Sequence, residues 1–273
     1  MSGTLARWAM TFGVAMLAGL TLFPLAWMLS VSLMSPLEAA DLPPHLLPRT
    51  PTLMHYQTLW QRLDLPRYLA NSLLLAAATT VLSLLFNTLG GYAFAKLRFA
   101  GRERLFRLLL ATMVIPAQVG MLPLFLMLKQ FGLVNTYAGV ILPGMASVFG
   151  IFMIRQYARS IPDSLLDAAR IDGAGEWRIF RSVVLPLCRP ILVTLALFSF
   201  LGSWNDFLWP LILLSDGDRY TLPVALANLL GEHAQDTELM MAGAVVTTLP
   251  AVLVFLLLQR HYLAGLATGA LKE

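Results

Sequence analysis

The sequence contains few charged residues. Asp, Glu, Lys and Arg make up 12% of its 273 residues, whereas about 25% is usual for a soluble domain. Hydrophobic residues make up 58%, which is more apolar surface than a single water-soluble globule of this size can bury. These proportions exclude an ordinary soluble domain and predict an integral membrane protein.

Reactive and metal-binding residues are also scarce. Cys188 is the only cysteine, so no intramolecular disulfide can form, and the four histidines are spread along the chain. The phosphate-binding pattern G-x-x-x-x-G-K-[ST] does not occur, and neither do the hydrolase patterns H-E-x-x-H and G-x-S-x-G. We therefore expect a non-catalytic chain that holds no cofactor or metal and does not hydrolyse ATP by itself.

Long apolar runs, in contrast, are abundant. Six of them approach or exceed the roughly 20 residues that cross a bilayer core of about 30 Å. The first is longer than the apolar region of a signal peptide, and no clean A-x-A cleavage site follows it, so we interpret it as a retained anchor. The predicted fold class is an all-α integral membrane protein with six transmembrane helices, at residues 10–34, 69–95, 108–128, 137–154, 190–214 and 239–258.

Positive charge is distributed unevenly among the segments between these runs. If the N-terminus lies inside, 14 of the 19 lysines and arginines fall on the cytoplasmic side, Arg260 and Lys272 near the C-terminus among them. Because positively charged flanks disfavour translocation, we expect both termini in the cytoplasm. Topology also accounts for the net charge of +4, so no nucleic acid partner is needed. The five lysines and arginines on the outer side are Arg49, Arg62, Arg67, Lys129 and Arg219.

Ionisable residues are nearly absent from the predicted spans. Asp206 is the one charge that precedes the end of a span, and it lies about 24 Å along a path of about 30 Å, near the outer surface. An ion-coupled carrier usually holds such groups near the bilayer midplane, so that class is disfavoured. The neighbouring Trp204 and Asn205 fit either an interfacial aromatic belt or the mouth of a sugar pathway, and both interpretations stay open.

The other polar residues of the spans are uncharged, as at Thr79, Ser83 and Asn87. Hydroxyls and amides commonly join membrane helices, so helix contact is the ordinary explanation. A pathway for an uncharged, hydroxyl-rich solute is also compatible with them. Two outer stretches, residues 35–66 and 221–235, are interpreted as connectors on the membrane surface, with contact to an external partner as the alternative.

The longest polar run in the second half is DSLLDAARIDGAGEWRIFRSVVLP, residues 163–186. The preceding residues fit the S-x-x-[DE] capping box from Ser160 to Asp163, which predicts a helix start. Gly173 and Gly175 are expected to end this helix, because glycine readily adopts the left-handed conformation of a helix C-cap. We expect its apolar face to consist of Leu165, Leu166, Ala168 and Ala169.

A second helix is then predicted, with Trp177, Phe180 and Val184 on one face and an end before Pro186. Such a hairpin could lie on the inner leaflet as an amphipathic surface element. Its arginines alternate with acidic residues, however, which favours a protein partner over anionic lipid. The segment is therefore interpreted as a cytoplasmic docking site.

The same segment resembles the EAA loop of permease subunits of bacterial ABC importers, whose pattern is E-A-A, three residues, G, nine residues and I-x-L-P. Here Asp167-Ala168-Ala169 is followed three residues later by Gly173 and, after nine more, by Val183-Val184-Leu185-Pro186. Asp replaces Glu and Val replaces Ile. The stretches NTLGGYAFAKLRFAGR, SWNDFLWP and YLAGLATGALKE are similar to the carbohydrate-uptake branch, specifically its maltose-type second permease.

This resemblance implies a permease subunit of an ATP-driven, binding-protein-dependent importer of di- or oligosaccharides in a bacterial inner membrane. It implies an anchor and extracytoplasmic segment at 1–68 and a transmembrane domain at 69–273, with an EAA loop at 161–186 between the fourth and fifth spans. The alternatives are an ABC permease for another solute, such as glycerol-phosphate, and an ion-coupled carrier. The loop residues expected to contact the ATP-binding subunits are Asp167, Ala168, Ala169, Asp172, Gly173 and Trp177.

The implied partners are a dimer of ATP-binding subunits, a second homologous permease, an extracytoplasmic solute-binding protein, the sugar and membrane lipid. The chain would form half of the translocation pathway. Trp204, Asn205 and Asp206 are the candidate residues that line it.

Overall fold

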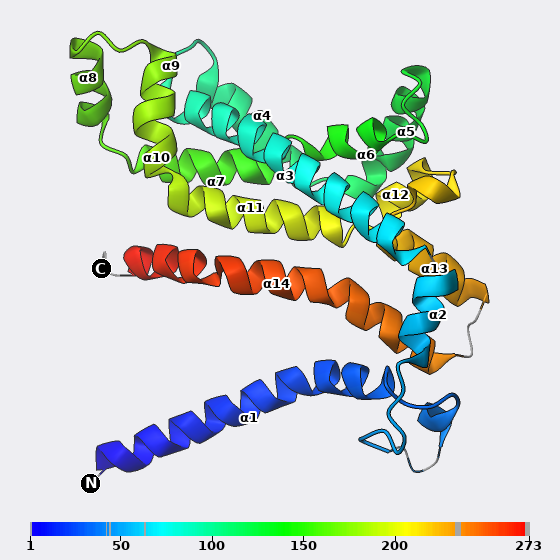
Figure 1. Cartoon of the computed structure of the whole chain (residues 1–273). Helices are drawn as coiled ribbons and strands as arrows, with labels where there is room; N and C mark the ends of the chain where they lie inside the picture. The colour runs from blue at the N-terminus through cyan, green and yellow to red at the C-terminus, as the bar shows by residue number, and fades with distance from the viewer. Residues whose placement is uncertain (1, 42, 44, 63, 233–235, 271–273) are drawn as a thin grey trace. The chain divides into compact units, whose positions relative to one another are not determined.

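The computed structural model of the protein describes residues 2–41, 43, 45–62, 64–232 and 236–270 (Figure 1). Within these ranges the chain is helical and contains no strand, which confirms the predicted all-α class. Lys272 and residues 233–235 of the second outer stretch lie outside the described residues.

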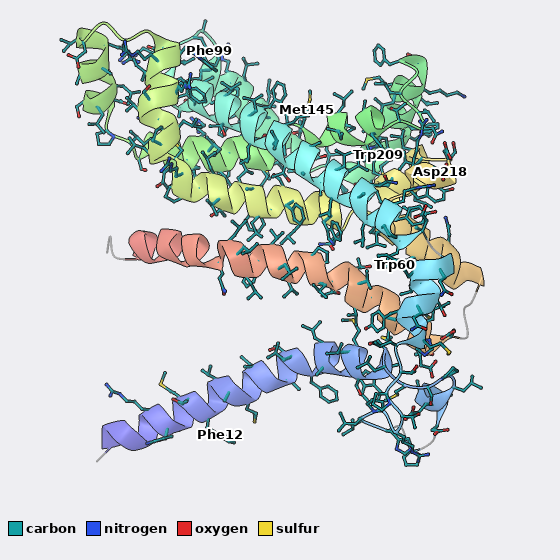
Figure 2. The ribbon with its side chains drawn as sticks, in the orientation of Figure 1. Phe12, Trp60, Phe99, Met145, Trp209 and Asp218 are labelled. Atoms are coloured by element: carbon teal, nitrogen blue, oxygen red, sulfur yellow. The ribbon has the colours of Figure 1, made fainter. Side chains whose placement is uncertain are left out.

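In the part of the chain that the structure describes, three single helices are long and apolar enough to cross a membrane. They are α1 (Ser2–Val31), α3 (Leu65–Lys96) and α14 (Thr237–Ala270). Most side chains of α1 from residue 7 to residue 26 are exposed, as Phe12 illustrates in Figure 2. Apolar side chains that meet no other part of the chain suit a helix whose surroundings are lipid.

The other predicted spans are bent pairs of shorter helices. The segments Arg102–Thr112 and Ala117–Gln130 meet at 95°, Tyr137–Gly144 and Val148–Arg159 at 41°, and Glu176–Leu187 and Arg189–Trp204 at 79°. Over the described residues the structure has up to six spans if each bent pair counts as one, so the predicted number of six stays a prediction. The helices of these bent pairs include α4 (Arg102–Thr112), η2 (Ala117–Gly120) with α5 (Met121–Gln130), α6 (Tyr137–Gly144), α7 (Val148–Arg159) and α11 (Arg189–Trp204).

Proline explains the sharpest of these bends. The apolar run 108–128 is not one helix, because α4 ends at Thr112 and Pro116 has an extended ψ of 134° before the next helical turn. Proline lacks a backbone N–H and disfavours the helical conformation of the residue before it, so a continuous hydrogen-bond ladder cannot pass this point.

The chain forms two compact units, residues 1–66 with 225–250 and residues 67–224 with 251–273. The first contains α1, η1 (Glu38–Ala40) and α2 (Met54–Arg62), with Val31, Met34 and Leu59 buried. Its irregular segment is held by carboxylates that accept from backbone N–H groups, as Glu238 Oε1 does from Ala39 at 3.0 Å.

The helices of the second unit approach closely at small residues. A Cβ atom placed on Gly91 would lie 2.5 Å from the side chain of Ile154, so α3 and α7 meet where only glycine fits. Asn87 of α3 also fixes the start of α7, because its Oδ1 accepts from the Ser147 backbone N–H at 2.8 Å. The predicted role of small and polar residues in helix contact is therefore confirmed at this pair of helices.

Candidate functional site

The first helix of the predicted docking hairpin is α8 (Asp163–Ile171). Gly173 follows it with a left-handed φ of +79°. The backbone N–H of Gly173 donates to the Arg170 carbonyl at 3.0 Å, and that of Ala174 donates to the Ala169 carbonyl at 2.9 Å. This pair of bonds defines a Schellman motif, so the predicted helix end at Gly173 is confirmed.

The start of α8 differs from the prediction. The capping box is wrong, because Ser160 is the C-cap of α7, where its hydroxyl donates to the Tyr157 carbonyl at 2.7 Å. Pro162 is the N-cap of α8 and offers no side-chain cap. Proline fits this place because the first N–H groups of a helix lack intrahelical partners in any case.

The second helix runs without interruption from Glu176 to Leu187, so the predicted end before Pro186 is wrong. It comprises α9 (Glu176–Ile179), a π-helical turn (Phe180–Val184) and α10 (Leu185–Leu187). In the π turn the Leu185 N–H donates to the Phe180 carbonyl, five residues back. This wider turn relieves the contact between a proline ring and the preceding carbonyls, which would break a regular α-helix.

A core cluster joins the hairpin to α3 and α7. Leu166 and Ile179 of the hairpin are buried together with Tyr92 of α3 and Ala158 of α7. The Tyr92 ring also packs on Phe180, with ring centroids 5.3 Å apart. The hairpin is therefore packed against membrane-spanning helices and is not a free surface loop.

The opposite side of the hairpin exposes apolar side chains. The exposed fraction is 87% for Ile171, 64% for Trp177 and 46% for Leu165, while Ala168 is also exposed. The predicted single apolar face is thus divided, since Leu166 and Ala169 turn toward the core and Leu165 and Ala168 away from it. Exposed apolar groups of this size next to charged residues are typical of a protein contact surface.

An ion-pair network links α8 to α9 and α3. Arg170 donates to Asp167 at 2.7 Å and to Glu176 at 3.0 Å, and the Tyr92 hydroxyl donates to the second Glu176 oxygen at 2.7 Å. These hydrogen bonds raise the pKa of the Arg170 guanidinium, so its positive charge is secure. The network joins the last turn of α8 to the first turn of the next helix and so fixes the angle between the two hairpin helices.

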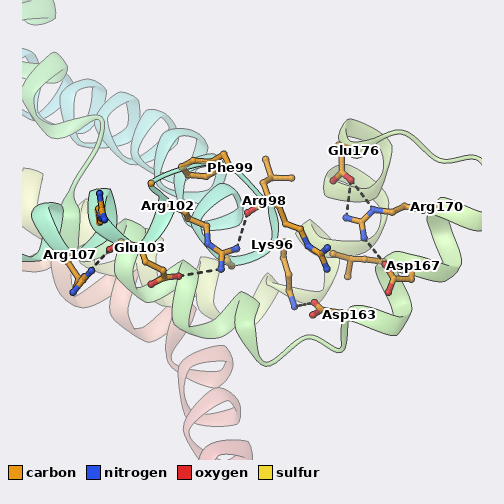
Figure 3. A pocket seen from close by; sticks show the side chains of 15 residues that line it. Lys96, Arg98, Phe99, Arg102, Glu103, Arg107, Asp163, Asp167, Arg170 and Glu176 are labelled. Carbon is orange, nitrogen blue, oxygen red and sulfur yellow. Dashed lines mark hydrogen bonds and ion pairs between the residues drawn. The ribbon is translucent and has the colours of Figure 1, made fainter.

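A groove of about 1430 Å³ lies beside the hairpin, between α8 and the segment that joins α3 to α4 (Figure 3). Lys96 donates to Asp163 at 2.6 Å and to the Ile161 carbonyl at 2.6 Å, which ties the end of α3 to the start of α8. The hydrogen bond from Lys96 lowers the pKa of the Asp163 carboxyl. The groove is therefore a charged surface whose ion pairs connect the hairpin to a membrane helix.

The predicted pathway residues occupy three different environments. Trp204 is 1% exposed and stacks on Phe200 with ring centroids 6.0 Å apart, and Asn205 is an exposed C-cap residue of α11. Asp206 lines a cavity of about 520 Å³, whereas the other two do not. The cavity also includes Thr79 and Ser83, for which the sequence left both helix contact and a solute pathway open; their spacing at i and i+4 places them on one face of α3.

Comparisons with known proteins show the family to which this chain belongs. Residues 86–267, which contain the whole hairpin, match the family described as "Binding-protein-dependent transport system inner membrane component". The chain belongs to this family. It is therefore a multi-pass, non-catalytic membrane component of a transport system.

Two relatives of this permease match 97% and 77% of its length. It is 39% identical over 268 residues to the arabinooligosaccharides transport system permease protein AraQ of Halalkalibacterium halodurans, covering 97% of this chain and 96% of that one. It is 36% identical over 211 residues to the lactose transport system permease protein LacG of Rhizobium radiobacter, with 77% of each chain covered.

A solved structure has the same fold as this permease. A chain of a bacterial ABC transporter involved in the import of the acidic polysaccharide alginate superposes with a TM-score of 0.81 at 27% sequence identity. The match covers 96% of this chain and 98% of that chain. The arrangement of helices is therefore that of an ABC importer permease.

Proposed function

We propose that this permease is a subunit of an ATP-driven, binding-protein-dependent importer of uncharged di- or oligosaccharides. The observation that carries the proposal is the hairpin at 163–187, in which the D-A-A-x-x-x-G spacing forms a helix ended by a Schellman turn. That helix presents Leu165, Ala168 and Ile171 outward. The names of the relatives, which are permeases for arabinooligosaccharides and lactose, support a saccharide as the solute.

ATP-binding subunits would dock on the exposed side of the hairpin. Asp167, Ala168, Asp172 and Trp177 are exposed there, Ala169 is half-buried, and Gly173 provides the turn between them. Because Leu166 and Ile179 are buried against α3 and α7, displacement of the hairpin would move these helices with it. Nucleotide-driven closure of two ATP-binding subunits would then switch the pathway between inward and outward access as a rigid-body motion.

The other subunits of the importer and the topology of this chain follow from the proposed function. ATP hydrolysis takes place on the partner subunits, a second homologous permease supplies the other half of the pathway, and an extracytoplasmic binding protein delivers the sugar. The hairpin and both termini lie in the cytoplasm, as the distribution of lysine and arginine favours. Residues 1–68 form the anchor and extracytoplasmic segment, and residues 69–273 form the transmembrane domain with the coupling loop.

The experiment is uptake of radiolabelled arabinotriose, lactose and maltose by the native host, with and without this chain. We expect at least one sugar to enter only when the chain is present, and the tagged permease to co-purify with an ATP-binding subunit. Inactivating that subunit should stop uptake. Uptake that persists without any ATP-binding subunit would instead establish an ion-coupled carrier, and chain-dependent uptake of glycerol-phosphate alone would exclude a saccharide importer.

A further inference from the structure

The segment that joins α3 to α4 is strongly basic. Residues 96–107 contain five lysines and arginines but a single acidic residue, Glu103. A cluster of this kind, directly after the cytoplasmic end of a membrane helix, lies at the level of the lipid headgroups and attracts anionic lipid. The hairpin at 163–187 differs, because acidic residues alternate with its arginines. The mixed charge that favours a protein partner for the hairpin is therefore missing from this segment.

The carboxylate of Glu103 is already used to hold α4 against α7. Its two oxygens accept from Arg155 Nη2 at 2.9 and 3.0 Å, and Oε1 also pairs with Arg102 at 3.3 Å. Arg155 is 6% exposed and lies over the Phe106 ring, 3.8 Å from its centroid. Glu103 is therefore neutralised by these two arginines and leaves the other basic residues of the segment uncompensated.

Three of these basic residues face the groove beside α8. Arg98, Arg104 and Arg107 are exposed, line the groove and form no ion pair within the described residues (Figure 3). Arg107 donates from Nε to the Glu103 carbonyl at 3.3 Å, which leaves both of its terminal NH₂ groups available. Guanidinium groups bind phosphate oxygens well, because they donate two parallel hydrogen bonds.

The acidic residues on the hairpin side of the groove already have basic partners. Lys96 donates to Asp163 at 2.6 Å, and Arg170 pairs with the other two carboxylates of the hairpin that line the groove. The hydrogen bond from Lys96 dominates the lowered pKa of Asp163, and the charge of Arg98 adds a small part from a distance. The groove as a whole is lined by six basic and four acidic residues, so it carries an excess of positive charge.

The connection between α3 and α4 has a fixed shape and exposes apolar side chains. Gly101 has a left-handed φ of +80°, and Arg102 donates to the Leu97 carbonyl at 2.9 Å, which closes the turn. Three apolar side chains next to the basic residues are exposed, at 41% for Phe99, 49% for Leu105 and 65% for Leu108. Cationic groups beside exposed apolar groups suit a ligand with a phosphate head and an acyl chain.

We propose that this surface binds the phosphodiester headgroup of an anionic phospholipid of the inner leaflet, with Arg98, Arg104 and Arg107 as the phosphate ligands. The proposal uses the cytoplasmic orientation of the hairpin and is independent of which solute is transported. A zwitterionic lipid is a poorer ligand, because its ammonium group is repelled by the arginines. Since α8 forms the other wall of the groove, the bound lipid would also support the position of the hairpin.

The test is lipid retention by the complete importer, purified from native membranes in detergent. The complex is incubated with equal amounts of dioleoyl phosphatidylglycerol and dioleoyl phosphatidylcholine, and native mass spectrometry counts the molecules of each lipid that stay bound. We expect at least about threefold more phosphatidylglycerol than phosphatidylcholine. The measurement needs no transport, so it gives a result even if the solute is not a saccharide.

Glutamine variants locate the preference in the groove. Removing the three groove charges together, as Arg98→Gln, Arg104→Gln and Arg107→Gln, should abolish the preference for phosphatidylglycerol. The matched control removes the same charge from three exposed arginines outside the groove, as Arg159→Gln, Arg181→Gln and Arg189→Gln, and should leave the preference unchanged. If the first triple variant does not accumulate in membranes, its three single variants replace it, and each should lower the preference.

Equal retention of the two lipids by the unmodified importer would overturn the proposal. An equal loss of preference in the two triple variants would also overturn it, because overall charge and not the groove would then attract the lipid. Groove variants that keep the lipid preference but lose the ATP-binding subunit would assign the groove to that subunit. Displacement of the lipid by inorganic phosphate would assign it to small anions.

Discussion

Two triplets of nearly identical composition occur in this chain and have opposite surroundings. Glu38-Ala39-Ala40 forms the 3-10 turn η1 in the first unit, and Asp167-Ala168-Ala169 lies in α8 of the second. Glu38 is 6% exposed, and its carboxylate accepts from the Arg49 backbone N–H, the Ser35 backbone N–H and the Ser35 hydroxyl. The side chain of Asp167 is 63% exposed, and among the described residues its ion-pair partner is Arg170.

The difference shows that the same kind of triplet can have entirely different surroundings. The carboxylate of Glu38 accepts hydrogen bonds from backbone N–H groups and so holds an irregular segment in place. Asp167, in contrast, lies beside exposed apolar residues and is followed by the left-handed turn at Gly173. What distinguishes the functional candidate is the conformation after the triplet and the surface around it. The following changes test that distinction in order of expected effect.

Replacing the turn residue should have the largest effect. Gly173→Trp forces a bulky residue into a φ of +79° and places a ring on the docking side, so we expect uptake to be abolished. A Cβ atom at Gly173 meets no atom within 4 Å, so membrane insertion should be normal by immunoblot of membranes. Sugar uptake by intact cells is the measurement.

Alanine variants separate backbone strain from bulk. Gly173→Ala should lower uptake several-fold, while Gly175→Ala should not, because Gly175 has an ordinary φ of −71° and equally open space. Normal uptake with Gly173→Trp would remove this turn from the mechanism.

Replacing the exposed tryptophan of the hairpin should have the second-largest effect. Trp177→Ala removes a ring that is 64% exposed, and buried interface tryptophans commonly dominate binding, so we expect about a tenfold or greater loss of ATP-binding subunit retained on the purified permease. Trp60→Ala in α2 is the control, since that ring is 60% exposed but lies in the first unit. An equal loss for both variants would mean that exposure alone, and not position in the hairpin, explains the effect.

Much of the hairpin was predictable from local residues. Gly173 ends α8 as expected, because the preference for glycine at a left-handed C-cap depends on the residue itself. The capping box at Ser160 failed because α7 extends to Arg159, so Ser160 belongs to the end of one helix instead of the start of the next. The π turn accommodates Pro186 inside the helix, an outcome that reading proline as a helix end does not anticipate.

The membrane cavity was harder to predict than the hairpin. Asp206 was identified because a charge inside an apolar run is conspicuous. Thr79 and Ser83 carry the same side chains as ordinary helix contacts, and Thr79 differs from Thr80 in that only the Thr80 hydroxyl donates to a carbonyl of the preceding turn. Pairing of this kind is a property of the folded chain, so composition and periodicity could not reveal it.

Replacing the buried Glu38 of the first triplet should lower the stability of the folded chain. Glu38→Gln exchanges a carboxylate for an amide whose NH₂ group cannot accept one of the existing hydrogen bonds, so we expect the amount of folded permease in membranes to fall several-fold. The hydrogen bond from the Arg49 backbone N–H, followed by those from Ser35, lowers the pKa of Glu38.

This lowered pKa also predicts a pH dependence. A carboxyl whose pKa is lower in the folded state stabilises the fold above its ordinary pKa, and that contribution disappears as the pH falls through the folded-state value. Proteolysis of the segment at 35–66 should therefore increase in acid for the unmodified chain, and the increase should be smaller for Glu38→Gln. An acid response of the same size in both would show that another group titrates.

The smallest effect is expected at Asp167, the residue that departs from the E-A-A pattern. Its carboxylate reaches Arg170 three residues on at 2.7 Å, and exposed ion pairs of this kind contribute little to stability, about 0–1 kcal/mol. Asp167→Glu keeps the charge and lengthens the side chain by one methylene, so uptake should stay within about twofold of normal. Asp167→Asn serves as the matched variant that removes the charge and keeps the length. If Asp167→Glu raises uptake well above that limit, the aspartate side chain is too short for a contact on the ATP-binding subunit. If only Asp167→Asn lowers uptake, the docking surface requires the charge at this position and not a particular side-chain length.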